Sequence, residues 1–157
     1  MATTTNNPAL RAITTGALIA GVLDATFAVI VDVLILRIFS LLGVLQWIAT
    51  GALGSAAFSG GLATAGLGVV IHFALAFFFA ALYYVAAQRI PPLRTQAAAF
   101  GLSYGIVIWL VMDLVVIPHS GVPASPFNPV VFVAFLVDHA VFVGLPIALA
   151  VKRYAMT

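Results

Sequence analysis

The sequence predicts an all-α integral membrane protein: a four-transmembrane-helix bundle with a short interfacial or re-entrant helix between the first and second spans. Three observations lead to this expectation. Of the 157 residues, 64% are hydrophobic and 6% are charged, whereas soluble domains carry about 25% charged residues. Four segments reach the roughly 20 apolar residues that a membrane-spanning helix needs. The other segments are short, so we expect one domain, residues 1–157.

The predicted spans are bounded and interrupted in different ways. Met1–Pro8 contains no Lys or Arg, so we expect a short polar tail rather than a signal peptide. Arg89–Arg94 holds two prolines between two arginines and predicts a tight turn, and Pro118–Pro129, with four prolines, predicts an irregular loop. Pro146 leaves the carbonyl of Phe142 without its usual donor, which predicts a kink. The spans are Ala12–Leu36, Gly66–Gln88, Gln96–Ile117 and Val130–Val151.

The segment Ile38–Ala65 admits two interpretations. Ser40–Phe58 is uncharged and long enough for a fifth span. However, the link after Leu36 is too short for a turn between antiparallel spans, and five glycines make a poor lipid-facing helix. We therefore expect an interfacial or re-entrant helix at about residues 44–54, with Trp47 at the level of the headgroups, followed by a glycine-rich loop.

The distribution of basic residues does not decide between four and five spans. With four spans and a cytoplasmic N-terminus, five basic residues lie inside and only Arg37 lies outside. With five spans and an outside N-terminus, Arg37 replaces Arg11 on the inner side and the count is equal. We expect four spans with both termini cytoplasmic, so that the inner basic residues are Arg11, Arg89, Arg94, Lys152 and Arg153.

Small residues form stripes that indicate close packing between helices. In the third span, Gly101 and Gly105 form a Gly-x-x-x-Gly pair, and Trp109 and Asp113 continue the same side. In the first span, a stripe about 80° wide at ~100° per residue carries two acids and is expected to face inward, away from lipid. Its members are Ala17, Gly21, Asp24, Ala28 and Asp32.

All acids of the sequence lie inside the predicted spans, which contain no Lys or Arg. A charged acid near the centre of a span costs about 2.5–3.5 kcal/mol on insertion scales, so these residues mark a candidate site. Two histidines, His72 and His139, also lie within spans, and His119 follows the third span. Counted from the helix ends, Asp24 lies near the midplane and the other acids and histidines lie in the outer half. The acids are Asp24, Asp32, Asp113 and Asp138.

Several groups can neutralise such acids: protons or hydrogen bonds that merely fix helix register, a protonated histidine, a bound cation, or a basic group of another chain. The four aspartates are therefore candidates for a proton or cation site. The three histidines are candidates for metal or haem ligands, without a spacing motif in support. Asp138 and His139 are neighbours that point about 100° apart, so we expect them not to ligate one ion together. The absence of cysteine excludes thiolate sites.

Four short segments, in the same order, resemble a group of small bacterial inner-membrane proteins with four spans and no assigned function. The segments are Gly21–Asp24, Leu45–Gly54, Ala57–Gly61 and Val115–Pro118. The resemblance covers most of the chain, and it implies a bacterial cytoplasmic membrane and a re-entrant first outer loop, but no activity. The group's pattern has an amide at the position of Asp113 and an apolar residue at that of His119, which argues against a metal site common to the group.

Three functions fit these features, and we prefer the first. It is an accessory subunit of a membrane complex, or a homo-oligomer, because stripes of small residues and little extramembrane mass suit helix association. The second is a proton- or cation-coupled small carrier or channel that uses the intramembrane aspartates. The third is a haem- or metal-binding membrane subunit that uses the histidines. We expect no enzyme and no resident cofactor, because no catalytic Ser/His/Asp spacing occurs, and no nucleic-acid partner, because the six Lys and Arg residues are scattered.

Overall fold

The computed structural model describes residues 7–155, so residues 1–6 of the predicted N-terminal tail lie outside the described chain. This chain is all-helical, as predicted, and contains no strand between residues 7 and 155. Its α-helices are α1 (Pro8–Ala28), α2 (Leu41–Leu53), α3 (Gly61–Arg89), α4 (Pro92–Thr95), α5 (Ala97–Val111), α6 (Pro129–Asp138) and α7 (Leu145–Ala155). Its π-helical segments are η1 (Val29–Ile35), η3 (Met112–Val116) and η5 (His139–Gly144), and its 3-10 segments are η2 (Gly54–Ser59) and η4 (Ile117–His119).

Five helices in the described chain are long and apolar enough to cross a membrane, one more than the four predicted spans. Four of them correspond to the predicted spans. The fifth is Leu41–Ser59, the ambiguous segment, and it is the least apolar of the five. Length and composition therefore leave the number of crossing helices open between four and five.

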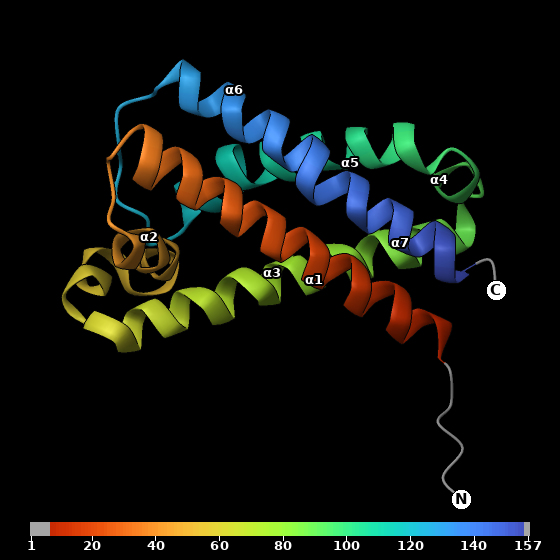
Figure 1. Cartoon of the computed structure of the whole chain (residues 1–157), viewed down its shortest axis with the longest axis horizontal. Coiled ribbons are helices and arrows are strands. Elements are labelled where there is room, and N and C mark those ends of the chain that lie inside the picture. Colours follow the sequence, from red (N-terminus) through yellow and green to blue (C-terminus); the bar gives the residue numbers. More distant parts are fainter. Residues whose placement is uncertain (1–6, 156–157) are drawn as a thin grey trace, which may run out of the picture.

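The direction of the helices distinguishes this fifth segment from the others. In Figure 1, α1, α3, α5 and the continuous α6–α7 unit run along the long axis in alternating directions, whereas α2 is seen nearly end-on and lies across one end. The start of α1 and the end of α7 lie at the opposite end. There the guanidinium carbons of Arg11 and Arg153 lie 4.8 and 5.5 Å from the ring centre of Tyr154. Within the bundle, α1 packs against α3 and α7, and α5 packs against η5 and α7.

Helix α2 is fixed against the first turns of α3. Gly68 lies so close to the carbonyl of Leu45 that a Cβ atom would overlap it. The Gln46 side-chain amide donates to the Gly61 carbonyl at 3.2 Å and to the Thr64 hydroxyl at 3.3 Å. The opposite face of this segment is apolar and exposed, with Leu41 at 58%, Leu42 at 36%, Leu53 at 45% and Phe58 at 41%. A helix that is apolar on its exposed face as well as on its packed face is poorly suited to contact with water.

The helix starts follow from local sequence. Asn7 and Asn128 are side-chain N-caps, and each is followed by a proline at the first helical position, where the missing N–H costs nothing. Ser40 caps α2 by accepting a hydrogen bond from the amide of Gly43 at 3.0 Å. The chain therefore restarts as a helix immediately after the short link that follows η1. The glycine-rich loop expected after α2 is shorter than predicted, because α3 begins at Gly61.

The link between η1 and α2 turns the chain sideways at Arg37, the non-glycine residue with a positive φ, 54°, in the described chain. This region of backbone space costs an L-residue about 1–2 kcal/mol and costs glycine nothing. Arg37→Gly is expected to raise the free energy of unfolding by up to about 1 kcal/mol, and Arg37→Val is expected to lower it by a similar amount. Thermal unfolding in mild detergent measures both effects. Arg37→Lys keeps the charge and the strain, so a shift in this control would contradict the backbone explanation.

Glycines allow α5 to approach the last helical unit at backbone distance. The Gly101 position faces Leu145 and Ala148, and a Cβ atom there would lie 3.0 Å from the Leu145 Cα atom. A Cβ atom on Gly105 would overlap the backbone of His139, and one on Gly144 would overlap the backbone of α5. The predicted small-residue stripe of the third span is thus used inside the bundle of this chain. This contact also fixes the backbone of η5 in space.

The irregular turn before Pro146 lies upstream of the proline. Residues His139–Gly144 form the π-helical segment η5, and α7 resumes at Leu145. Proline has no N–H to donate and its ring collides with the carbonyl four residues earlier, here that of Phe142. A wider π-helical turn relieves this conflict, and such turns are frequent at functional sites. The expected disturbance of the helix therefore takes the form of a π-helical turn.

Two tyrosines satisfy their polar groups in the half of the bundle nearer the termini. The Tyr83 hydroxyl donates to the carbonyl of Leu93 and the Tyr104 hydroxyl to that of Phe79, each at 2.8 Å. Their rings lie 4.9 Å apart. The surrounding core consists largely of alanine and branched aliphatic side chains. This half of the bundle is therefore tightly packed and internally satisfied.

Candidate functional site

Acids and histidines from three helical units converge inside the bundle. One ligand atom each from Asp24 on α1, Asp138 at the end of α6 and His139 in η5 lie within 4.8 Å of one another. His72 on α3 joins them, because its Nδ1 atom lies 3.8 Å from Oδ2 of Asp24. We call these four residues the Asp–His cluster. The sequence marked all four as candidates, but it did not indicate that they meet.

The two neighbours Asp138 and His139 do meet, so the expectation that they point apart was wrong. The His139 Nδ1 atom lies 3.1 Å from Oδ2 of Asp138 and 3.0 Å from the carbonyl oxygen of Phe135. Backbone directions that diverge by about 100° are overcome here because the imidazole folds back over the preceding turn. Since a carbonyl oxygen only accepts hydrogen bonds, Nδ1 carries the proton and donates it. The lone pair of neutral His139 is then on Nε2.

The imidazole of His72 is oriented by the backbone of α1. Its Nε2 atom lies 2.8 Å from the carbonyl oxygen of Gly21, so Nε2 carries the proton and donates it. The lone pair of neutral His72 is therefore on Nδ1, the atom nearest Asp24. The 3.8 Å separation of Nδ1 from Oδ2 of Asp24 is longer than a hydrogen bond. Nδ1 and the Asp24 carboxyl group thus face each other without a direct bond.

The cluster is shielded from the surroundings and has one unpaired acceptor. Exposed side-chain fractions are 0% for Asp138, 12% for His139, 13% for His72 and 19% for Asp24. The Oδ1 atom of Asp138 is buried and has no hydrogen-bond partner. The ring of Trp109 lies 5.0 Å from that of His139, and its buried Nε1 atom also has no partner. Buried polar atoms are usually paired, and the neighbouring carboxyl groups of Asp24 and Asp138 can satisfy each other by sharing a proton or by binding a common cation.

The remaining candidates lie elsewhere. Asp32 is in η1, where its Oδ1 atom is buried without a hydrogen-bond partner, and Asp113 is in η3. His119 is exposed and its Nδ1 atom bonds to the carbonyl of Val115 at 2.7 Å. In residues 7–155, these three do not belong to the group whose ligand atoms lie together. The expected outer cluster is therefore divided, and His119 is separated from the other two histidines.

Asp24 lies level with the other cluster residues, so the expectation that it is separated in depth from Asp138, His72 and His139 was wrong. Asp24 lies eleven positions before Ile35 at the end of η1, and His72 lies eleven positions after Gly61 at the start of α3. The helix α3 starts five residues earlier than predicted, which moves His72 about 7.5 Å deeper at 1.5 Å per residue. An error in the predicted end of a helix therefore becomes an equal error in the predicted depth of each residue counted from that end.

Packing closes the cluster toward the termini and aromatic rings flank it toward α2. On the terminal side lies the glycine contact between α5 and η5 described above. On the other side, the ring of Phe135 lies 5.6 Å from that of Phe27 and 5.8 Å from that of Trp109. The sequence placed Trp109 on the same side of its helix as Gly101 and Gly105 but gave no reason to place it on His139.

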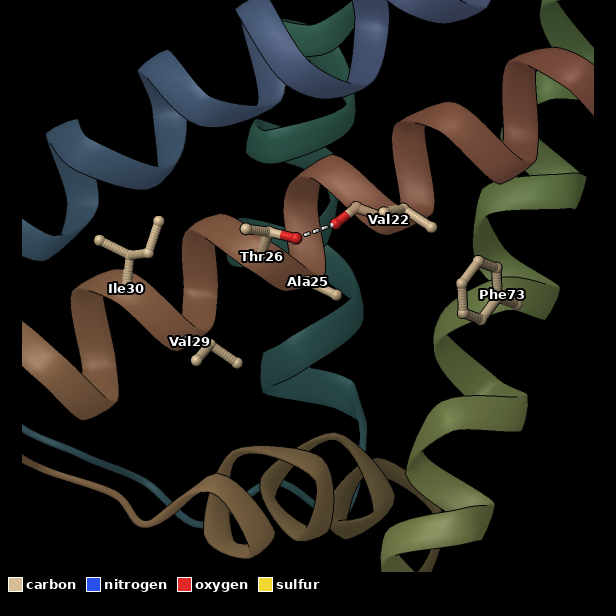
Figure 2. Close-up of a pocket in the computed structure, with 6 residues that line it drawn as sticks. All are labelled: Val22, Ala25, Thr26, Val29, Ile30 and Phe73. Carbon is tan, nitrogen blue, oxygen red and sulfur yellow. Dashed lines mark hydrogen bonds between the residues drawn. The ribbon is translucent and has the colours of Figure 1, made fainter.

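A hollow of about 340 Å³ lies between α1 and α3, and it is a different feature from the cluster. Figure 2 shows that it opens where these helices diverge above α2. The hydroxyl of Thr26 donates to the carbonyl of Val22 at 2.7 Å, so this hollow presents no free polar group of its own. Its lining consists of Val22, Ala25, Thr26, Val29, Ile30 and Phe73.

No protein family, no characterised protein and no solved structure matches this chain. The chemistry of the site therefore has to come from the site itself. The Asp–His cluster offers two carboxyl groups and two imidazoles, but no hydroxyl or thiol nucleophile among its members. Such a set of groups binds cations.

Proposed function

We propose that this protein is a small integral membrane carrier that binds a cation at the Asp–His cluster and moves it across the bilayer. The observation that carries this proposal is the fully buried carboxyl group of Asp138, which lies beside the carboxyl group of Asp24 and the imidazole of His139. Two carboxyl groups in a low-dielectric interior repel each other when ionised. The Lys and Arg residues of the described chain lie at helix ends, so a bound cation is the simplest neutralising partner.

In this proposal four helices cross the bilayer and α2 lies in its boundary. The crosswise direction of α2, its apolar outer face and its lower hydropathy support this arrangement (Figure 1). Arg11, Arg89, Arg94, Lys152 and Arg153 then lie at the end that carries the termini, and Arg37 lies at the other. By the positive-inside rule, the terminal end is cytoplasmic. The resemblance to bacterial inner-membrane proteins supports a bacterial cytoplasmic membrane as the location.

A carrier fits the site better than an open channel does. The half of the bundle on the terminal side of the cluster is closed by backbone contacts at Gly101 and Gly105 and by the tyrosine pair. A cation at the cluster therefore needs a rearrangement of the bundle to leave on that side. Alternating exposure of one buried site is the usual behaviour of carriers.

Two other functions remain proposals with less support. The accessory-subunit hypothesis was motivated by small-residue stripes, and the stripe of α5 is already occupied by η5 of the same chain. For haem ligation, the Nε2 atom of His72 is engaged by the Gly21 carbonyl and its Nδ1 atom faces a carboxyl group at 3.8 Å. This geometry suits a single ion better than the plane of a haem.

Cation flux into proteoliposomes tests the proposed function. Vesicles containing the full-length protein are assayed with Na⁺, K⁺, H⁺, Mg²⁺ and Zn²⁺, each alone, using ion-sensitive dyes. We expect flux of at least one cation above that of empty vesicles, and at least a tenfold reduction in the double variant Asp24→Asn/Asp138→Asn. Asp113→Asn is the matched control, because it removes an acid outside the cluster and should retain wild-type flux.

Two results would contradict the proposed function. If the wild-type protein gives no more flux than empty vesicles for any of these cations, the carrier is excluded. Native mass spectrometry of the same preparation then tests the accessory-subunit alternative, which requires a defined partner or a second copy of this chain. Undiminished flux in the double variant would show that transport does not use the cluster.

A further inference from the structure

We propose that the cation of the Asp–His cluster is a single divalent transition-metal ion of the Zn²⁺ class, bound by Asp24, Asp138, His72 and His139. This inference deepens the proposed function, because it rests on the same site and names the ion. An acidic pair alone would not justify it. The additional observation is the Oδ1 atom of Asp138, which has no donor group, on a side chain with 0% exposure whose carboxyl group converges with ligand atoms of two other residues.

The orientation of both imidazoles matches that of metal-bound histidines. A histidine that ligates a metal donates its other N–H group to a carbonyl or carboxylate, which fixes the tautomer and the ring. His72 donates through Nε2 to the Gly21 carbonyl at 2.8 Å, so Nδ1 is available beside Asp24. His139 donates through Nδ1 to the Phe135 carbonyl at 3.0 Å, so Nε2 is available. Each ring is thus held through one nitrogen atom, and its other nitrogen atom remains for the ion.

The carboxyl group of Asp138 has one oxygen bonded to His139 and one that can ligate the ion. Its Oδ2 atom accepts from His139 Nδ1 at 3.1 Å, and no donor group bonds to its Oδ1 atom. Because the two nitrogens of the His139 ring point in nearly opposite directions, Oδ1 can join an ion on Nε2 only after Oδ2 leaves Nδ1, and the Phe135 carbonyl then holds the ring. Trp109, packed on His139, covers the ring from the side of α5.

The distances between the ligand atoms are close to those of a zinc site. Donor atoms sharing a zinc ion at about 2.0–2.2 Å lie no more than about 4.4 Å apart. The ligand atoms of Asp24, Asp138 and His139 lie within 4.8 Å of one another, and Nδ1 of His72 lies 3.8 Å from Asp24. Rotation of the side chains can bring one ligand atom each of Asp24, Asp138 and His139 into this range.

The mixed donor set selects the class of ion. Imidazole nitrogen suits Zn²⁺ and its neighbours in the transition series, whereas Mg²⁺ and Ca²⁺ prefer oxygen ligands alone. Thiolates, which select Cu⁺, are absent from the sequence. Two carboxylates also neutralise a divalent ion, so the occupied site carries no net charge inside the bundle. A monovalent cation would leave one negative charge uncompensated.

Titration with Co²⁺, a spectroscopic substitute for Zn²⁺, tests this inference. Untagged full-length protein in lipid nanodiscs is stripped with a chelator, and its visible absorption is recorded as Co²⁺ and then competing Zn²⁺ are added. We expect one Co²⁺ per chain, displaced by Zn²⁺, and an affinity that is 10–100-fold lower in each of Asp24→Asn, Asp138→Asn, His72→Gln and His139→Gln. The controls Asp113→Asn and His119→Gln remove the same residue types outside the cluster and should bind like the wild type.

The outcomes separate this inference from the proposed function. If folded wild-type protein binds neither Co²⁺ nor Zn²⁺, or binds them equally well in the Asp138→Asn variant, the inference is wrong. Flux of Na⁺ or K⁺ without transition-metal binding would overturn the inference and retain the carrier. Binding of one Co²⁺ at the four named residues without flux would retain the inference and exclude the carrier.

Discussion

Gly105→Leu is expected to prevent formation of the bundle, whereas Gly66→Leu is expected to leave it intact. Both glycines lie within α-helices, so the gain in helix propensity is similar at the two positions. A Cβ atom on Gly105 would overlap the His139 backbone and lie 2.6 Å from the Cα atom of Ala140. At Gly66 no atom lies within 4 Å of the added Cβ. Because backbone cannot rotate away as a side chain can, we expect Gly105→Leu to cost more than about 3 kcal/mol.

The measurement is thermal unfolding in mild detergent, together with the fraction of monodisperse protein on size exclusion. We expect the Gly105→Leu protein to be aggregated or absent and the Gly66→Leu protein to match the wild type within about 0.5 kcal/mol. The milder Gly105→Ala variant should still fold in part, with η5 displaced and metal affinity reduced. Equal stability of the two leucine variants would contradict the close approach of α5 and η5.

A bound divalent ion is expected to stabilise the wild-type protein and not the Asp138→Asn variant. A ligand that binds only the folded state adds about 2.7 kcal/mol to the free energy of unfolding at 100 times its Kd. We therefore expect Zn²⁺ at that concentration to raise the unfolding temperature of the wild type clearly. Asp138→Asn removes an anionic ligand while keeping the side-chain shape, so this shift should disappear.

The same variant distinguishes a binding site from a structural contact. In the absence of metal, Asp138 is a buried acid with an unpaired oxygen, so replacing it with the neutral amide should leave stability unchanged or increased. An acid that only fixes helix register would give the opposite result, with Asp138→Asn less stable in the absence of metal. Asp113→Asn serves as the control and should keep the full stabilisation by Zn²⁺.

The sequence by itself determined the helical class and the positions of the main apolar helices. Runs of about 20 apolar residues between prolines and charged turns leave few alternatives, because backbone groups in an apolar medium must bond within their own helix. It also identified every member of the Asp–His cluster, since acids and histidines inside such runs are costly. The close packing at Gly101 and Gly105 was expected for the same kind of reason: glycine is rare in helices except where a backbone approaches.

Only the tertiary structure decided which of these residues meet. The depth of His72 depended on where α3 begins, and that start is set by the glycines and the packing of α2, not by hydropathy. The pairing of Asp138 with His139 depended on a side-chain rotamer and on the π-helical turn before Pro146, which helical periodicity does not describe. The direction of α2 depended on a five-residue link and a positive φ at Arg37. The sequence shows that acids and histidines lie inside apolar helices, where burying them is costly. Which group offsets that cost depends on contacts between residues far apart in the chain.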